Sequence, residues 1–142
     1  MILLDTNVLS ELMRPEPEET VLDWVDQLNR ETTYISTINQ AEILQGVMLL
    51  PDGKRKQQLT KKAEQMFQLF EQRILPFDIR AAEIYAEVVV GRQQQGRPIY
   101  FQDAQIAAIT IEYNCAIATR NVSDFKEIER LKLLILGSSY DV

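Results

Sequence analysis

The chain opens with Met1-Ile2-Leu3-Leu4-Asp5, a short continuous apolar run that ends at a charge. Such a run is typical of a strand buried on both faces of a parallel sheet, because a strand with one wet face alternates apolar and polar residues. Similar short strands are expected further along the chain, at Thr33–Ser36, Ile74–Pro76, Cys115–Thr119 and Leu133–Leu136.

Helical patterns lie between these strands. They cover Glu18–Leu28, Ile38–Leu50, Lys54–Glu71, Ala81–Gln94 and Gln102–Tyr113. Strands that alternate with helices predict an α/β fold whose central parallel sheet is covered by helices on both faces. The clearest breaks, Pro51-Asp52-Gly53 and Gly96-Arg97-Pro98, look like loops between elements rather than domain linkers. We therefore expect residues 1–142 to form a single domain.

The composition restricts the chemistry. The chain has no histidine and one cysteine, and its formal net charge is −6. A Ser–His–Asp triad, a Cys–His pair and the usual zinc sites are therefore excluded, and oxygen ligands for Mg²⁺ or Mn²⁺ remain. The acidic balance argues against a protein that coats nucleic acid, but it does not exclude a nuclease. The basic clusters Lys54-Arg55-Lys56 and Lys61-Lys62 are interpreted first as a solvated helix face, with phosphate contact as the alternative.

Several features bear on the compartment. Cys115 lies in the apolar run Cys-Ala-Ile-Ala, so we expect a buried structural thiol, and a chain without a disulfide framework suits a reducing cytosol. The first residues lack the basic region and long apolar stretch of a secretory signal. No segment is long enough to span a bilayer. We therefore expect a cytoplasmic protein with no membrane partner.

Two carboxylates, Asp5 and Glu42, lie at positions in a predicted strand and a predicted helix that are compatible with a binding site. Asp5 ends the first strand, and open parallel sheets bind ligands outside the carboxyl ends of their strands. The alternative is that Asp5 caps the following helix. Glu42 falls beside Ile38 and Ala41, on the edge of the apolar stripe of its helix. A plain surface glutamate is equally compatible with that position.

Asp103 is the more informative carboxylate. At helical spacing it shares its side with Ile106, Ala107 and Thr110. A carboxylate on the apolar side of a helix should be paired, neutral or bound to a metal. A role at the helix start is the alternative, because acidic residues favour the first turn.

A fourth candidate position follows the apolar run 116–118. There the chain turns polar at Thr119-Arg120-Asn121, and Asp124 follows. Thr119 and Asn121 are candidates for binding a water or a metal, and an ordinary turn explains them equally well. If the four positions converge, several carboxylates share one crevice, and one or two divalent cations offset their repulsion most simply. Such a centre can activate a water and stabilise the leaving oxygen of a phosphodiester.

Four segments carry a resemblance to a known family. They are Ile2–Glu11 (Ile-Leu-Leu-Asp-Thr-Asn-Val-Leu-Ser-Glu), Ile35–Gly46 (Ile-Ser-Thr-Ile-Asn-Gln-Ala-Glu-Ile-Leu-Gln-Gly), Asp103–Ala108 (Asp-Ala-Gln-Ile-Ala-Ala) and Ile117–Phe125 (Ile-Ala-Thr-Arg-Asn-Val-Ser-Asp-Phe). In this order and spacing the chain resembles PIN-domain ribonucleases, specifically the VapC-type toxins of bacterial toxin–antitoxin pairs in the FitB-like branch. The resemblance implies a three-layer α/β/α sandwich and Mg²⁺- or Mn²⁺-dependent endonucleolytic cleavage of RNA. It also implies that Asp5, Glu42 and Asp103 are the metal ligands.

The chain departs from the family pattern at one position. Many family members have an aspartate after the Thr-Arg pair, where this chain has Asn121. We expect Asp124 to supply the missing charge, and Thr119 to hold a water or to position Asp124. The resemblance further implies a homodimer that a small antitoxin inhibits by placing its basic tail in the acidic crevice. An arginine fork would complement carboxylates there.

Two other functions fit parts of the sequence. Phosphoryl transfer through an aspartyl intermediate fits Asp5 at the end of the first strand. Haloacid-dehalogenase-like enzymes, however, carry a second aspartate two residues after the nucleophile, where this chain has Asn7. A degenerate PIN domain that binds RNA or protein without catalysis fits Asn121, although the other acids argue against it. Cleavage of RNA is therefore the leading hypothesis.

Overall fold

The fold is built on a parallel sheet. The structure is a computed structural model that describes residues 1–136, and residues 137–142 of the predicted domain lie outside the described part. Its strands are β1 (Ile2–Leu4), β2 (Thr33–Ser36), β3 (Ile74–Leu75), β4 (Ala116–Thr119) and β5 (Lys132–Ile135). They form a five-stranded sheet in the order β3-β2-β1-β4-β5, and neighbouring strands are parallel. The predicted parallel sheet is confirmed, with β2 at its predicted bounds and the other strands shortened or shifted slightly.

Helices connect and cover the strands. They are α1 (Thr6–Leu12), α2 (Glu19–Asp26), α3 (Thr37–Met48), α4 (Lys54–Leu69), α5 (Ile79–Gln94), α6 (Phe101–Glu112) and α7 (Val122–Phe125), with the 3-10 turn η1 (Arg30–Thr32). The predicted helical segments correspond to α2 through α6. The sequence pattern did not delimit α1, α7 and η1, because one or two turns are too short to show a helical period.

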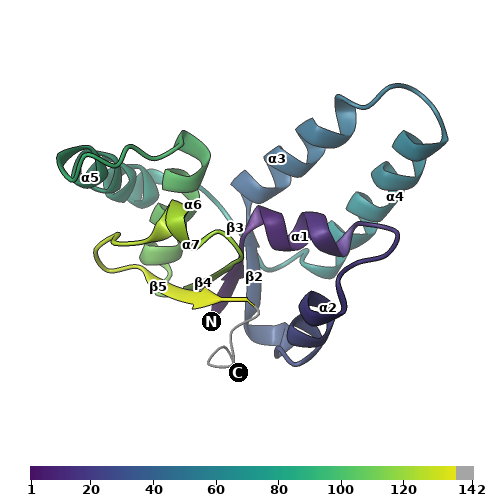
Figure 1. Ribbon diagram of the computed structural model, residues 1–142, viewed down its shortest axis with the longest axis horizontal. Helices are drawn as coiled ribbons and strands as arrows, with labels where there is room; N and C mark the ends of the chain where they lie inside the picture. The colour runs from purple at the N-terminus through teal and green to yellow at the C-terminus, as the bar shows by residue number, and fades with distance from the viewer. Residues whose placement is uncertain (137–142) are drawn as a thin grey trace.

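Two apolar clusters lie on opposite faces of the sheet. Leu3 belongs to the cluster beneath α5 and α6, which includes Ile106 and Ile109. Leu4 belongs to the cluster formed with α1, α2 and α4, which includes Val8 and Trp24. Consecutive strand residues point to opposite faces, so the fully buried pair Leu3 and Leu4 joins both layers of the core. Figure 1 shows the resulting three-layer α/β/α arrangement, with the sheet between the two groups of helices.

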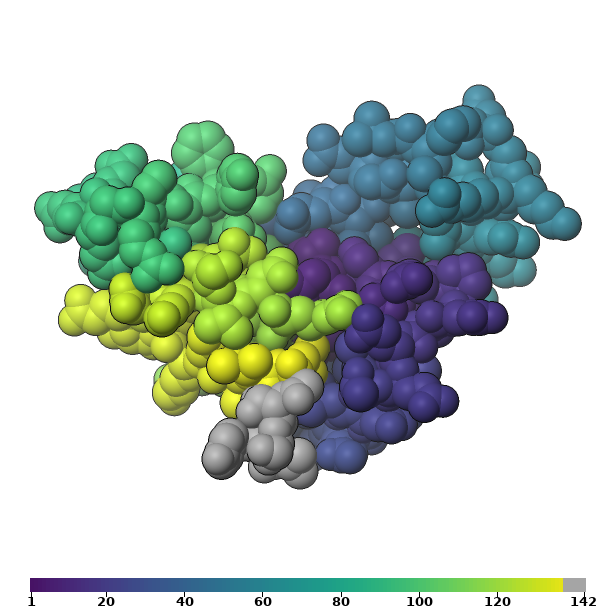
Figure 2. Space-filling model, in the orientation of Figure 1, coloured from purple at the N-terminus to yellow at the C-terminus, as the bar shows by residue number. Residues whose placement is uncertain are grey.

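The strand order places a binding crevice. From β1 the chain runs outward through β2 and β3, and it then returns to the other side of β1 to form β4 and β5. The carboxyl ends of β1 and β4 therefore meet at a topological switch point, where open α/β sheets bind ligands. Figure 2 shows a hollow between the α5–α6 layer (green) and the α3–α4 hairpin (blue), with the start of the chain (purple) at its base.

Two further expectations concern the thiol and the membrane. Cys115 is buried, and burial raises the pKa of its thiol, so the expected inert structural thiol is confirmed as buried. Among the helices of residues 1–136, none combines the length and the apolarity that crossing a bilayer requires.

Candidate active site

Asp5 lies directly after β1, at the carboxyl end of this strand. It is 4% exposed, and its pKa rises to about 6. Burial is the main cause, and the negative charges of Glu42 and Asp124 act in the same direction, whereas hydrogen bonds from Thr119 and Thr6 oppose it. Burial and like charges both disfavour an ionised carboxyl group. Asp5 is therefore a desolvated carboxylate that faces two others.

Asp103 lies in the first turn of α6 and interacts with the charges of the other site carboxylates. Burial raises its pKa to about 7, and the charges of Asp124, Asp5 and Glu42 add to the shift. The charge of Arg92 partly opposes them. Ile106, Ala107 and Thr110, which were predicted to share the side of Asp103, are fully buried. The structure thus brings together carboxylates from the end of β1 and from α3, α6 and α7.

Hydrogen bonds fix both oxygens of Asp5. The Thr6 backbone N–H donates to Asp5 Oδ1 over 2.8 Å, and Thr119 Oγ1 donates to Asp5 Oδ2 over 2.8 Å. Asp5 is also the N-cap residue of α1, so the helix-capping alternative holds together with the site position.

Thr119 forms three hydrogen bonds through its hydroxyl group. Besides its bond to Asp5, Thr119 Oγ1 accepts from Asn7 Nδ2 over 3.3 Å and from the Asn121 backbone N–H over 2.9 Å. A hydroxyl group offers one donor and two acceptor sites, so this hydroxyl has none left. The structure shows Thr119 in contact with Asp5, and its expected roles of binding a water or a metal, or of positioning Asp124, stay predictions.

A second threonine orients Glu42. Thr6 Oγ1 donates to Glu42 Oε1 over 2.8 Å and accepts from Asn39 Nδ2 over 2.8 Å. Asn39 is fully buried, and the backbone N–H and hydroxyl of Ser36 both donate to Asn39 Oδ1 over 2.7 Å. Ser36 and Asn39 form the capping box of α3, with Asn39 at the position that usually carries Glu or Gln. The helix cap and the orientation of Glu42 therefore belong to one hydrogen-bond chain.

Asp124 and Asn121 differ in their surroundings. Asn121 is exposed, it precedes α7, and its side chain makes no capping bond. Asp124 is half-buried in α7, and its charge raises the pKa of both Asp5 and Asp103. This arrangement favours Asp124 over Asn121 as the source of the additional negative charge.

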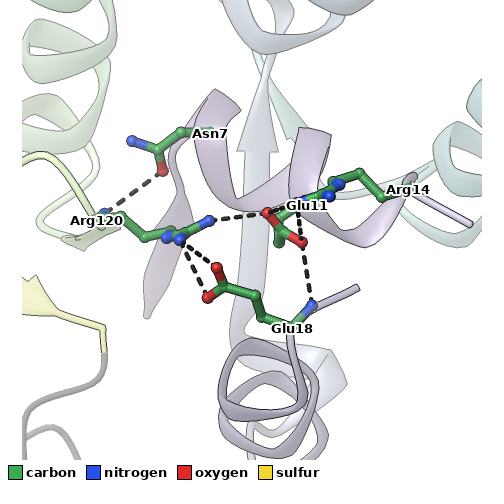
Figure 3. A network of polar contacts seen from close by, with 5 residues as sticks. All are labelled: Asn7, Glu11, Arg14, Glu18 and Arg120. Carbon is green, nitrogen blue, oxygen red and sulfur yellow. Dashed lines mark hydrogen bonds and ion pairs between the residues drawn. The ribbon is translucent and has the colours of Figure 1, made fainter. Parts of the chain in front are cut away.

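An ion-pair network around the buried Glu11, which the sequence analysis missed, lies at this end of the sheet (Figure 3). Arg120 Nη1 donates to Glu11 Oε1 over 2.9 Å, and its Nη2 reaches Glu18 over 3.0 and 3.1 Å. Glu11 is 5% exposed, and the Glu18 backbone N–H, then Arg120 and Arg14, lower its pKa. The Arg120 backbone N–H also contacts Asn7 Oδ1 over 3.5 Å. The network joins the end of β4 to α1 and α2, next to the residues that hold Asp5.

The donor set fits a hard divalent cation. Within residues 1–136, no three acidic, cysteine or histidine side chains stand in a ready arrangement to hold a metal ion. Mg²⁺ needs no such cage, because it keeps several waters and is usually held by one or two protein carboxylates. Burial is the main cause of the raised pKa values of Asp5 and Asp103, and the neighbouring carboxylates add to both shifts. Oxygen donors with excess negative charge suit Mg²⁺ or Mn²⁺ rather than zinc.

Comparisons with known proteins give matches over most of the chain. The model of the PIN domain family matches residues 2–131. The chain is 44% identical over 126 residues to Toxin FitB of Neisseria gonorrhoeae, covering 88% of this chain and 91% of that protein. It is 38% identical over 127 residues to VapC ribonuclease Y4jK of Sinorhizobium fredii, covering 89% of this chain and 91% of that protein.

The fold comparison gives the same result. The crystal structure of FitAcB from Neisseria gonorrhoeae has a TM-score of 0.87 and 42% sequence identity, and the match covers 94% of this chain and 96% of that chain. Matches of this length leave no major part of the described fold unaccounted for. The chain therefore belongs to the PIN-domain family, in the branch that contains the FitB and VapC toxins.

Proposed function

We propose that this protein is a divalent-metal-dependent RNA endonuclease and the toxin of a toxin–antitoxin pair. The observation that carries the proposal is the convergence of Asp5, Glu42, Asp103 and Asp124 in one crevice, where the pKa values of Asp5 and Asp103 are raised to about 6 and about 7. The names of the similar proteins, a toxin and a VapC ribonuclease, support the same conclusion.

In this proposal Asp5, Glu42 and Asp103 hold Mg²⁺ or Mn²⁺, and Asp124 adds negative charge beside them. A bound divalent cation supplies an activated water at neutral pH and charge stabilisation for the leaving oxygen. Thr119 and Thr6 keep Asp5 and Glu42 oriented through the hydrogen bonds described above. Orientation of ligating carboxylates by such outer contacts commonly changes metal affinity or activity about 10- to 100-fold.

The same proposal includes two protein partners. A cognate antitoxin inhibits the enzyme by placing basic side chains in the crevice, where an arginine fork pairs with carboxylates. The toxin itself forms a homodimer. Light scattering on an inactive variant tests the second point, and a monomer at micromolar concentration would contradict it.

Cleavage of RNA by the purified protein, freed of any antitoxin, tests the proposed activity. We expect cleavage in Mg²⁺ or Mn²⁺ and its loss in EDTA. Asp103→Asn should abolish cleavage with the fold intact. Asp52→Asn is the matched control, because the Asp52 side chain is fully exposed and pairs only with Lys56. Undiminished cleavage in EDTA would reject the metal mechanism.

If the wild-type protein binds RNA without cutting it, this experiment supports the alternative of a degenerate, non-catalytic PIN domain. Growth arrest gives an independent comparison. Expression of the wild type alone should arrest growth, whereas Asp103→Asn, or the wild type together with its antitoxin, should not. Equal arrest by wild type and Asp103→Asn would exclude RNA cleavage as the cause.

A further inference from the structure

Arg92 is a buried arginine whose hydrogen bonds reach the segments that contain Asp103 and Asp124. It belongs to α5 and is 5% exposed. Its Nε donates to the carbonyl oxygen of Arg97 over 2.8 Å. Its Nη1 donates to the carbonyl oxygens of Asp124 over 3.0 Å and of Lys126 over 3.3 Å. The two nitrogens therefore bind backbone on two separate segments of the chain.

These segments carry two of the site carboxylates. The loop at Arg97 leads into α6, whose first turn holds Asp103. The carbonyl of Asp124 belongs to α7, which holds the Asp124 side chain. A further ion pair, from Arg97 Nη1 to Glu127 Oε2 over 2.8 Å, ties the same two segments together at the surface. Arg92 thus bridges the backbone that carries Asp103 and the backbone that carries Asp124.

The charge of Arg92 also faces the crevice. Within residues 1–136, no carboxylate lies at ion-pair distance from its guanidinium group, and its hydrogen bonds there end on the backbone carbonyls of Arg97, Asp124 and Lys126. Burial and the neighbouring Arg97 lower its pKa, whereas the charges of Asp124, Glu127 and Asp103 raise it. Because no contacting carboxylate neutralises the positive charge of Arg92, this charge interacts with acidic side chains that lie further away. Here those acids include two carboxylates of the crevice.

We infer that Arg92 is a positioning residue for the proposed metal site. Its two nitrogens set the α7 segment, and with it the Asp124 carboxylate, against the start of α6. Its fixed positive charge also lets the site carboxylates stand close together before a cation binds. This inference rests on the proposed function, because it concerns the cation that the carboxylates would hold.

Arginine is required for this role by geometry. A guanidinium group presents separated donors in a rigid plane, whereas lysine keeps the charge but has a single nitrogen. Arg92→Lys therefore removes the bridge between the two segments and leaves the charge in place. Arg73→Lys is the matched control. Arg73 also donates to backbone carbonyls, those of Arg30, Thr33 and Leu69, but it lies directly before β3, at the opposite end of the sheet from the crevice.

Mn²⁺ titration calorimetry on the metal-free full-length protein, without RNA, tests the inference. We expect Arg92→Lys to bind Mn²⁺ about tenfold more weakly than wild type, which is the usual effect of disturbing an outer contact of a metal site. Arg73→Lys should bind Mn²⁺ like wild type. In an Asp124→Asn background, Arg92→Lys should change the affinity by no more than about twofold, because a residue that acts through Asp124 cannot act without it.

The outcomes separate this inference from the proposed function. If wild type binds Mn²⁺ and Arg92→Lys binds it equally well, the inference is overturned and the metal site stands. If Arg92→Lys weakens binding equally with and without Asp124, Arg92 does not act through Asp124 and the inference is again overturned. If wild type does not bind Mn²⁺, the proposed metal site fails together with the inference. Should Arg92→Lys not fold, Arg92→Gln takes its place, and because it removes the charge as well as the bridge, only the difference between its effects with and without Asp124 is compared; equal effects in the two backgrounds overturn the inference.

Discussion

Thr119 and Asp5, 114 residues apart in the sequence, share a hydrogen bond of 2.8 Å from Thr119 Oγ1 to Asp5 Oδ2. The register of the sheet explains this contact. Leu4 of β1 pairs with Ala118 of β4, so the residues that follow them emerge side by side at the carboxyl ends of adjacent parallel strands. The backbone N–H of Asp5 continues the ladder to the carbonyl of Ala118 over 2.9 Å.

The first prediction concerns this hydrogen bond. Thr119→Val keeps the shape of the side chain but leaves Asp5 Oδ2 without its donor, so we expect RNA cleavage to fall about tenfold. Thr119→Ser keeps the hydroxyl and should retain most of the activity. The control is Thr110→Val, since the equally buried Thr110 donates only to the carbonyl of Ile106 in its own helix. Equal losses in Thr119→Val and Thr110→Val would show that buried hydroxyls matter here only for the fold.

The second prediction concerns the pH dependence of folding without metal. The pKa of Asp103 rises from an ordinary 3.8 to about 7 in the folded protein. A raised pKa means that the folded state binds the proton more tightly, so this contribution to stability is complete below about pH 4 and is lost as the pH rises through about 7. At pH 8, Asp103→Asn should therefore be more stable than metal-free wild type, by about 1–2 kcal/mol after allowance for partial exposure.

Urea unfolding at pH 5 and pH 8 measures this difference. The advantage of Asp103→Asn should be larger at pH 8 than at pH 5, and Mn²⁺ should stabilise wild type more than the variant. Asp52→Asn serves as the control for removing an exposed acid. Destabilisation of Asp103→Asn at pH 8 would assign Asp103 a structural role at the start of α6.

The third prediction compares the two candidates for the fourth ligand position. Asp124→Asn should weaken Mn²⁺ binding several-fold, because a half-buried charge that acts on both Asp5 and Asp103 is removed. Asn121→Asp should strengthen binding by a smaller factor, since the Asn121 side chain is exposed. Calorimetry on both variants gives the comparison. If Asp124→Asn binds Mn²⁺ and cleaves RNA like wild type, Asp124 has only a structural role in the turn.

The fourth prediction lies outside the crevice, between α5 and α6. Burial and the carboxylate of Asp78 raise the pKa of Glu112 to about 7, and Glu112 Oε2 is a buried oxygen with no hydrogen-bond partner. When Glu112 is protonated, it can donate a hydrogen bond to the carboxylate of Asp78. Asp78 is the N-cap residue of α5, and it also accepts hydrogen bonds from the backbone N–H of Ala81 and the hydroxyl group of Tyr113. The stabilising proton is present below about pH 4.5 and is lost as the pH rises through about 7.

Glu112→Gln supplies a permanent donor to Asp78. We expect the variant to be about 1 kcal/mol more stable than wild type at pH 8 and similar to it at pH 4, which chemical denaturation at both pH values would measure. Glu83→Gln, at an exposed position of α5 whose ion pair with Arg80 lies on the surface, is the control. A lower stability of Glu112→Gln at pH 8 would mean that Glu112 is ionised in the folded protein.

Much of the fold could be predicted from local patterns. The apolar run before Asp5 predicted β1, and burial of Leu3 and Leu4 in opposite layers is the physical reason for that run. The helical period identified α6 and placed Asp103 on its buried side, because this property depends on a few neighbouring residues. The absence of histidine restricted the chemistry to oxygen ligands.

The sequence by itself therefore determined the sheet and the longer helices, and it identified the candidate carboxylates. Only the tertiary structure decided how those carboxylates are held. Thr119 was a candidate ligand in the sequence and became the hydrogen-bond donor to Asp5, and the roles of Arg92 and Glu11 had no sequence signal beyond a charged residue in an amphipathic helix. The physical reason is that these contacts join residues from different elements. Strand order and register, set by the burial of both faces of the sheet, determine which side chains meet.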